Sequence, residues 1–139
     1  MRVLRILLAE DNRGDVLLVR ESLREHRIKH ELYVVRDGQE ALDYVGRMGG
    51  TDEVPYPDLI LLDLNLPKVD GSTVLGELRQ HPESARVPVI VVTSSDSAKD
   101  KERMAQFGIS CYFRKPTEYE DYMQLGSIVK QVLEAQHSV

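Results

Sequence analysis

The sequence has few of the features that mark a secreted, thiolate-rich or membrane-spanning protein. A single cysteine, Cys111, excludes an internal disulfide and a cluster of thiolate metal ligands. The longest aliphatic runs, such as residues 87–92, are far shorter than the ~20 apolar residues of a transmembrane helix. These observations are typical of a protein in a reducing compartment, so we expect a cytoplasmic location and no membrane partner.

The sequence also has no excess of basic residues. Its 18 lysine and arginine residues are outnumbered by 23 aspartate and glutamate residues, which gives a formal net charge of −5. A surface that binds nucleic-acid phosphates needs the opposite balance, so we expect no nucleic-acid partner. Hydrophobic residues make up 42% of the chain and charged residues 29%, as in ordinary globular domains. We therefore expect residues 1–139 to form a single domain.

Short aliphatic runs alternate with amphipathic stretches along the chain. The strand candidates are residues 3–9, 32–35, 58–63, 87–93 and 109–113. Each is followed by a helix candidate, at about residues 16–24, 37–45, 72–81, 97–108 and 117–132. This alternation predicts an α/β fold with a doubly wound, five-stranded parallel sheet and helices on both faces.

Two of the helix candidates begin with the spacing of a capping box. Asp37 precedes Glu40 by three residues, and Thr117 precedes Glu120 in the same way, so we expect helices to begin there. The candidate at 97–108 has few apolar residues and should be weakly held. The link 46–58 is longer than most connections, and it is either a partner surface or a mobile excursion.

Chemically useful side chains follow the aliphatic runs. Ligands of doubly wound sheets bind in the crevice at the carboxyl ends of the strands. The residues at those ends are Glu10, Asp11, Asp63, Thr93 and Lys115. Taken singly, each has an ordinary structural explanation, such as helix capping, a turn or a solvated side chain. Taken together, they predict one site.

The residue types at this predicted site favour phosphoryl chemistry. Three carboxylates without histidine or cysteine are ligands for a hard cation, and Mg²⁺ is the natural candidate. A divalent cation, the Lys115 ammonium and the Thr93 hydroxyl would neutralise the oxygens of a phosphoryl group. Asp63 could then act as a nucleophile and form an acyl phosphate.

Four segments carry a resemblance to a known family. "LLAEDN", "LILLDLNLPKVDG", "PVIVVTSS" and "YFRKP" occur in the order and spacing of the receiver domains of bacterial two-component response regulators. The resemblance covers essentially the whole chain and implies the flavodoxin-like strand order 2-1-3-4-5. It implies a receiver that takes a phosphoryl group from a sensor histidine kinase onto Asp63. Because one helix candidate follows the last strand candidate before Val139, we expect no output domain. Glu10, Asp11, Asp63 and the backbone carbonyl of Asn65 would bind Mg²⁺.

The resemblance also assigns roles to residues around the phosphoacceptor. Thr93 and Lys115 would contact the phosphoryl group, and Tyr112 would be the switch aromatic that turns inward. A half-buried Tyr112 that never moves is the alternative. Asn65 and Ser95 would border the attacking water and tune the lifetime of the acyl phosphate. The Lys115–Pro116 bond is usually cis in this family.

Some details resemble stand-alone receivers that pair with phytochrome-like kinases. These are "EDNRGD", "VTSSD" and the long link 46–58. The implied partners are such a sensor kinase or a phosphotransfer protein, and a downstream protein target. A homodimer would use the face of the fourth helix, fifth strand and last helix. Gly126 departs from the expected pattern there, because glycine costs a helix ~1 kcal/mol relative to alanine.

Three other functions share this fold class or this chemistry. An aspartyl-nucleophile phosphatase of the haloacid-dehalogenase type needs a second aspartate two residues after the first, where this chain has Asn65. A flavodoxin-like electron carrier needs a phosphate-cradling first loop, but residues 9–15 present acids. A pseudo-receiver that only binds partners would lack one of the five site residues. We therefore expect a phosphoacceptor signalling protein and not an enzyme, beyond its own phosphorylation and autodephosphorylation.

Overall fold

The structure, a computed structural model, describes residues 2–137. Its strands are β1 (Leu4–Ala9), β2 (His30–Val35), β3 (Leu59–Leu62), β4 (Val89–Thr93) and β5 (Cys111–Arg114). Its helices are α1 (Arg13–Glu25), α2 (Gly38–Arg47), α3 (Gly71–Gln80), α4 (Ala98–Ala105), α5 (Tyr119–Tyr122) and α6 (Gln124–His137). None of these helices combines the length and apolar composition that a membrane span requires.

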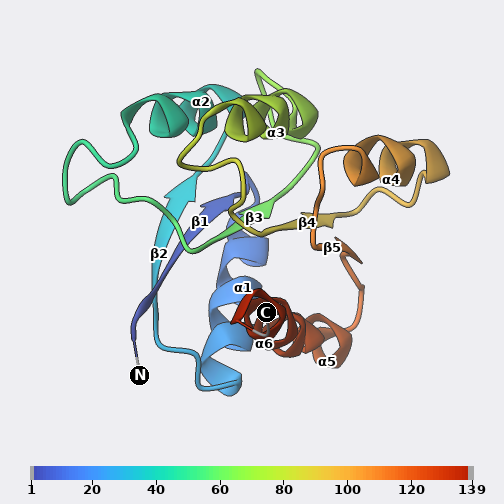
Figure 1. Ribbon diagram of the computed structural model, residues 1–139. Helices are drawn as coiled ribbons and strands as arrows, with labels where there is room; N and C mark the ends of the chain where they lie inside the picture. The colour runs from blue at the N-terminus through green and yellow to red at the C-terminus, as the bar shows by residue number, and fades with distance from the viewer. Residues whose placement is uncertain (1, 138–139) are drawn as a thin grey trace.

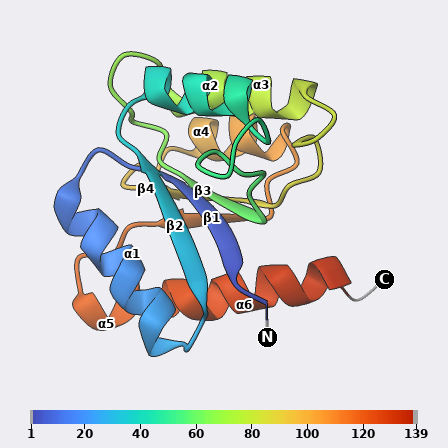
Figure 2. The same cartoon turned by 90° about the vertical axis from the view of Figure 1, so that its left-hand side faces the viewer.

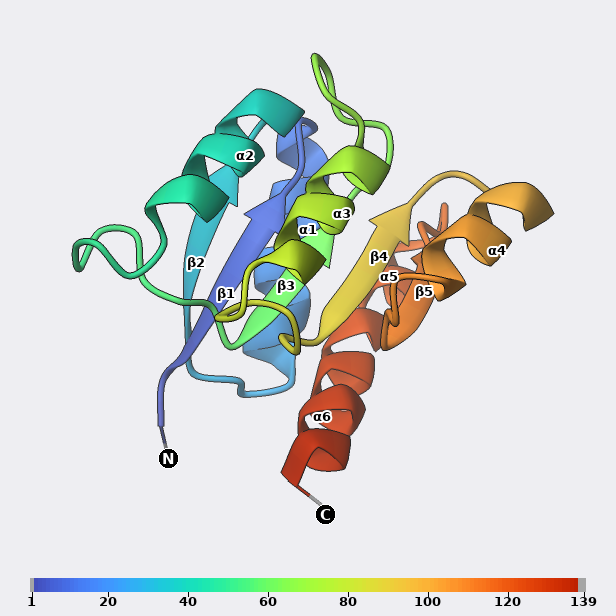
Figure 3. The ribbon, with the colours of Figure 1, turned by 45° about the horizontal axis from the view of Figure 1, so that its top comes forward.

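The strands form one parallel sheet in the order β2-β1-β3-β4-β5 (Figure 1). Helices α2, α3 and α4 cover one face, and α1, α5 and α6 cover the other (Figure 2). The predicted doubly wound fold and its strand order are therefore confirmed. Figure 3 shows the carboxyl ends of β1, β3 and β4 pointing toward the same edge of the sheet.

Alternation along β3 explains why the core has two halves. Leu59 and Leu61 pack on the side of α1 and α6, while Ile60 and Leu62 pack on the side of α2 and α3. All four side chains are fully buried, which requires helices on both faces of the sheet. Burying a side chain of this size stabilises the fold by about 1.5–3 kcal/mol, so the central strands form a rigid base for their carboxyl ends.

Side-chain caps set the beginnings of four helices. The Asp37 carboxylate accepts the Glu40 amide at 2.7 Å and begins α2 as predicted. Asn12, Asp70 and Ser97 cap α1, α3 and α4 in the same manner. These caps satisfy amides that have no partner within the helix.

The capping box expected at Thr117 is wrong. Helix α5 begins at Tyr119 without a side-chain cap, and the helical run is interrupted at Met123 before α6. The interruption coincides with the Ser22 hydroxyl of α1, which donates to the Met123 carbonyl and accepts the Gly126 amide, both at 2.8 Å. A side chain from a distant helix thus replaces local capping in this segment.

Gly126 permits this close approach of α6 to α1. A Cβ at position 126 would lie 2.3 Å from Nδ1 of His26 and 2.6 Å from the Ser22 carbonyl oxygen. Real Cβ atoms essentially never come so close, so helix packing requires glycine here. The helix-propensity cost noted in the sequence is offset by the contact it allows.

The link 46–58 folds back on itself. The Gly49 amide donates to the Val54 carbonyl at 2.7 Å, and the Val54 amide donates to the Thr51 carbonyl at 3.2 Å. The Tyr44 hydroxyl, buried in α2, donates to the Pro55 carbonyl at 2.8 Å. Gly49 has a φ of +79°, a conformation that favours glycine. The two functions predicted for this link stay predictions.

Candidate functional site

Backbone hydrogen bonds continue the sheet by one residue into the crevice at its carboxyl edge. The Glu10 amide donates to the Val35 carbonyl at 2.9 Å, and the Asp63 amide donates to the Ala9 carbonyl at 3.1 Å. The Lys115 amide donates to the Thr93 carbonyl at 2.7 Å. The side chains of Glu10, Asp63 and Lys115 are therefore positioned by sheet pairing and not by flexible loops.

Three carboxylates meet at this edge. One oxygen each of Glu10, Asp11 and Asp63 lies within 4.8 Å of the other two. Glu10 and Asp63 are 1% and 5% exposed, whereas Asp11 is open to solvent. An all-oxygen group with one solvent-exposed member fits a hard cation that keeps some of its waters, as Mg²⁺ does.

Lys115 extends from β5 into the same group. Its ammonium nitrogen lies 2.7 Å from a Glu10 oxygen and 2.9 Å from Oδ2 of both Asp63 and Asp15. A lysine ammonium has three N–H donors, so three acceptors use its full capacity. The structure thus brings Glu10, Asp11, Asp63 and Lys115 together, as the sequence predicted.

Asp15 is the member of this group that sequence reasoning missed. It lies in the first turn of α1, where an acidic residue is ordinarily explained by the helix dipole. A signal was present, because Asp15 follows Asp11 by four residues and a helix beginning at Arg13 turns that position toward the same crevice.

Burial and charge act in opposite directions on the ionisable groups here. Burial raises the pKa of Glu10 to about 7, although its hydrogen bond with Lys115 works against the shift. Burial alone would lower the pKa of Lys115, but hydrogen bonds with Asp15, Glu10 and Asp63 outweigh it and raise the pKa above its ordinary value. Lys115 therefore stays charged, and one ammonium faces several carboxyl groups. Such an excess of negative charge favours binding of a further cation.

The residues that follow Asp63 and Thr93 in the chain connect the two. The Asn65 amide donates to Oδ1 of Asp63 at 3.0 Å, which leaves Oδ2 for Lys115. The fully buried Thr93 hydroxyl lies 3.4 Å from the Asn65 side-chain nitrogen and 3.4 Å from the Ser95 amide, both long hydrogen bonds. Thr93 is thus held weakly between two loops.

Tyr112 contacts the same loop from β5. Its hydroxyl donates to the Ser95 carbonyl at 2.9 Å, and its half-buried ring packs against the core beneath α4. The Lys101 ammonium lies 5.6 Å from the ring centroid, within cation–π distance. The switch role of Tyr112 stays a prediction. The Lys115–Pro116 bond is trans, so the expectation of a cis bond is wrong.

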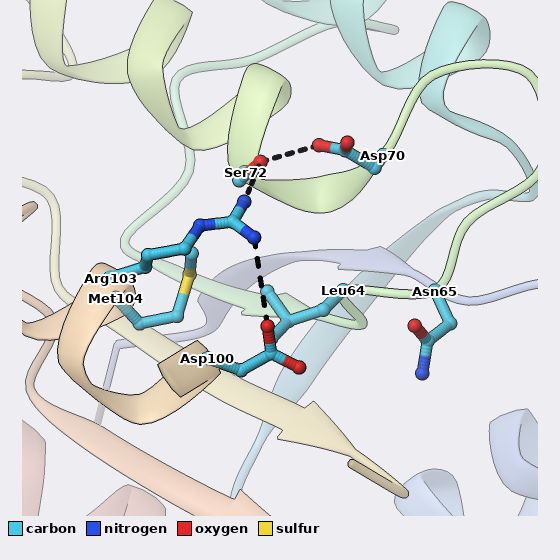
Figure 4. Close-up of a pocket in the computed structure, with 7 residues that line it drawn as sticks. All are labelled: Leu64, Asn65, Asp70, Ser72, Asp100, Arg103 and Met104. Carbon is cyan, nitrogen blue, oxygen red and sulfur yellow. Dashed lines mark hydrogen bonds and ion pairs between the residues drawn. The ribbon is translucent and has the colours of Figure 1, made fainter. Parts of the chain in front are cut away.

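A small polar cleft separates α3 from α4 beside these residues (Figure 4). Arg103 of α4 crosses it, donating to the Ser72 hydroxyl of α3 at 2.7 Å and pairing with Asp100 at 3.6 Å. The Ser95 hydroxyl donates to the other Asp100 oxygen at 2.6 Å. The loop that borders Thr93 is therefore connected to α4 by polar side chains.

Comparisons with known proteins agree with this arrangement. The family model of the response regulator receiver domain matches residues 6–125. Rcp1 of Synechocystis sp. is 41% identical over 120 residues, which cover 86% of this chain and 82% of that protein. The Mn²⁺-bound structure of Rcp1 matches with a TM-score of 0.84 and 39% identity, covering 94% of this chain and 95% of the other.

Two further solved structures are similar. The phosphorylated cyanobacterial phytochrome response regulator RcpA matches with a TM-score of 0.86 and 35% identity, covering 97% of this chain and 96% of the other. The receiver domain of a sensor histidine kinase from Pseudomonas aeruginosa, with a magnesium ion in its active site cleft, has a TM-score of 0.75 and 28% identity, covering 96% and 99%. From its sequence, fold and site geometry, the chain belongs to the response regulator receiver domain family and is a two-component signalling protein, similar to Rcp1 and RcpA.

Proposed function

We propose that this receiver accepts a phosphoryl group on Asp63 from a sensor histidine kinase, in a reaction that depends on Mg²⁺. The observation that carries the proposal is the meeting of Glu10, Asp11 and Asp63 within 4.8 Å, with the Lys115 ammonium hydrogen-bonded to two of them. Glu10, Asp11, Asp63 and the Asn65 carbonyl would hold the cation. Metal-bound relatives support this choice of site.

In the proposed reaction, an oxygen of Asp63 attacks the phosphorus of a phosphohistidine. The O–P bond forms as the N–P bond breaks, and the imidazole leaves with the electron pair and takes up a proton. Bound Mg²⁺ would supply positive charge to the phosphoryl oxygens. Lys115 already donates to Oδ2 of Asp63, so its ammonium is in place to transfer that hydrogen bond to a phosphoryl oxygen.

The switch would begin at Thr93. Its hydroxyl has only long contacts with Asn65 and Ser95, so reorienting toward a phosphoryl oxygen breaks no short hydrogen bond. The movement would pull on the loop that holds the Tyr112 hydroxyl and the α4 residue Asp100. Asn65 and Ser95, both small and polar, would border the attacking water and so influence the acyl-phosphate lifetime.

The partners follow from the same proposal. The likeness to RcpA, a cyanobacterial phytochrome response regulator, supports a phytochrome-like histidine kinase or a phosphotransfer protein as the donor. Output would pass by protein contact to a downstream target, and a homodimer would use the face of α4, β5 and the last helical segments. The protein would catalyse its own phosphorylation and autodephosphorylation and no other reaction.

The test is phosphorylation in solution. The protein is incubated with Mg²⁺ and acetyl phosphate and its intact mass is measured beside that of Asp63→Asn. We expect wild type to gain one phosphoryl group, and we expect no gain in the variant or when the metal is chelated. Equal labelling of wild type and Asp63→Asn would overturn the proposal. Turnover of an added phosphoester would instead favour the phosphatase.

A further inference from the structure

We infer that Asp15 is a positioning residue for phosphoryl transfer, which holds the Lys115 ammonium in place when Mg²⁺ occupies the site. The inference rests on the proposed function and gives a role to Asp15, the last residue of the "EDNRGD" segment, to which the resemblance assigned none. It starts from the contact between Oδ2 of Asp15 and the Lys115 ammonium at 2.9 Å, across 100 positions of the chain.

The three acceptors of Lys115 differ in what else they would bind. Glu10 and Asp63 belong to the proposed metal ligands, so a bound cation would compete with Lys115 for their lone pairs. Among the described acceptors of Lys115, Asp15 alone stands outside that proposed set. It would keep one full hydrogen bond to the ammonium while the other two are shared with the metal.

The backbone around Asp15 is well suited to hold a side chain still. The Asp15 amide donates to Oδ1 of Asn12 at 3.0 Å, which fixes the first turn of α1. The carboxylate is only 18% exposed, so water competes weakly for its oxygens. The Ser22 hydroxyl of α1 hydrogen-bonds with the backbone of Met123 and Gly126 and so connects α1 to the start of α6. An acceptor on a fixed helix costs little entropy when it binds Lys115.

Tyr122 of α5 is a buried side chain whose hydroxyl is affected by the charge of Asp15. Its hydroxyl is buried and has no hydrogen-bond partner among residues 2–137. Burial raises the pKa of the Tyr122 hydroxyl, and the negative charge of Asp15 adds to the shift. The Asp15 carboxylate is therefore partly withdrawn from solvent where it meets Lys115.

A purely structural role for Asp15 predicts different behaviour. An aspartate in the first turn of a helix interacts with the helix dipole wherever its carboxylate points. Here the carboxylate forms a charge-assisted hydrogen bond with Lys115, which directly follows β5, and such bonds are stronger than neutral ones. Loss of that bond would leave Lys115 with two acceptors, both in the proposed metal site.

The test compares Asp15→Ala, Asp15→Asn and a matched control, Glu25→Gln, which removes a charge from an exposed residue of the same helix. Phosphorylation by acetyl phosphate is followed at saturating Mg²⁺. We expect Asp15→Ala to be about tenfold slower than wild type, since one hydrogen bond to a charged group is lost. Asp15→Asn keeps an acceptor oxygen, so its phosphorylation rate should lie between those of wild type and Asp15→Ala. The rate of Glu25→Gln should match wild type.

A second measurement separates positioning from folding. The Lys115 ammonium is observed in ¹H–¹⁵N spectra of the unphosphorylated protein at saturating Mg²⁺, with urea unfolding as a check on the fold. We expect a slowly exchanging signal in wild type and Glu25→Gln, and its loss by fast exchange in Asp15→Ala. An unchanged rate in Asp15→Ala overturns the inference, and so does an unchanged ammonium signal. If wild type takes up no phosphoryl group, the proposed function fails, and the ammonium signal still decides whether Asp15 holds Lys115.

Discussion

Helices α4 and α6 lie on opposite faces of the sheet, and the structure holds them by different means (Figure 2). Helix α6 buries Leu125, Val129 and Val132 and meets α1 so closely that position 126 has no room for a Cβ. Helix α4 buries one side chain of its own, Met104, and is otherwise attached by polar contacts from Asp100 and Arg103.

We therefore regard α6 as a fixed support and α4 as the helix that can move when the site changes. Apolar burial and close packing resist displacement, because cores have few alternative arrangements. Polar contacts at a surface contribute less free energy and can be exchanged for water. Ser95 links the Thr93 hydroxyl to α4, whereas Asp15 on α1 holds Lys115. A change at Asp63 should therefore move α4 and leave α1 and α6 in place.

The largest effect should come from emptying the core under α6. Leu125→Ala should lower the free energy of unfolding by about 3 kcal/mol, since a fully buried side chain leaves a cavity. Met104→Ala in α4 should cost less, about 2 kcal/mol, because a loosely held helix can move to fill the space. Urea denaturation of both variants measures the contrast. A larger cost at Met104 would contradict the comparison.

A smaller effect should come from adding one methyl group at the α1–α6 contact. Gly126→Ala should cost about 2 kcal/mol, since the new Cβ meets the Ser22 carbonyl and His26. Gly76→Ala is the matched control, because a Cβ there meets only Phe107 at 3.8 Å and alanine favours a helix. The free energy of unfolding of the control should rise by about 0.5–1 kcal/mol. Thermal unfolding should show melting temperatures shifted in opposite directions, and a neutral Gly126→Ala would show that α6 is free to adjust.

The smallest effect on stability is expected at the polar attachment of α4. Arg103→Ala removes the bond to Ser72 and the pairing with Asp100, both at partly exposed positions, so unfolding should become easier by less than about 1 kcal/mol. Hydrogen exchange of the α4 amides should nevertheless become faster, while the α6 amides stay protected. Faster exchange in both helices would show that Arg103 supports the whole fold.

The sequence predicted the parts of this structure that depend on local pattern. The aliphatic runs become strands, and Asp37 begins a helix through a bond to Glu40 only three residues away. Glu10, Asp11, Asp63 and Lys115 meet because parallel strands all end at the same edge. The helix start needs only neighbouring residues, and the meeting of the site residues needs only the sheet topology.

The sequence could not predict contacts that depend on how helices pack. The break at Met123 depends on Ser22, a residue about a hundred positions earlier, and the local capping pattern at Thr117 gave no sign of it. Gly126 is unfavourable for the helix that contains it, and the close contact that requires glycine there is made by α1. For Asp15, the spacing from Asp11 indicates the crevice, but its contact with Lys115 depends on how α1 packs against the sheet.

The most direct test of the account is hydrogen exchange before and after phosphorylation, on wild type and Asp63→Asn treated alike with Mg²⁺ and acetyl phosphate. We predict altered protection in the β4–α4 loop, α4 and β5 of wild type only, with the buried turns of α6 unchanged. Changes centred on α1 and α6, or equal changes in Asp63→Asn, would contradict it.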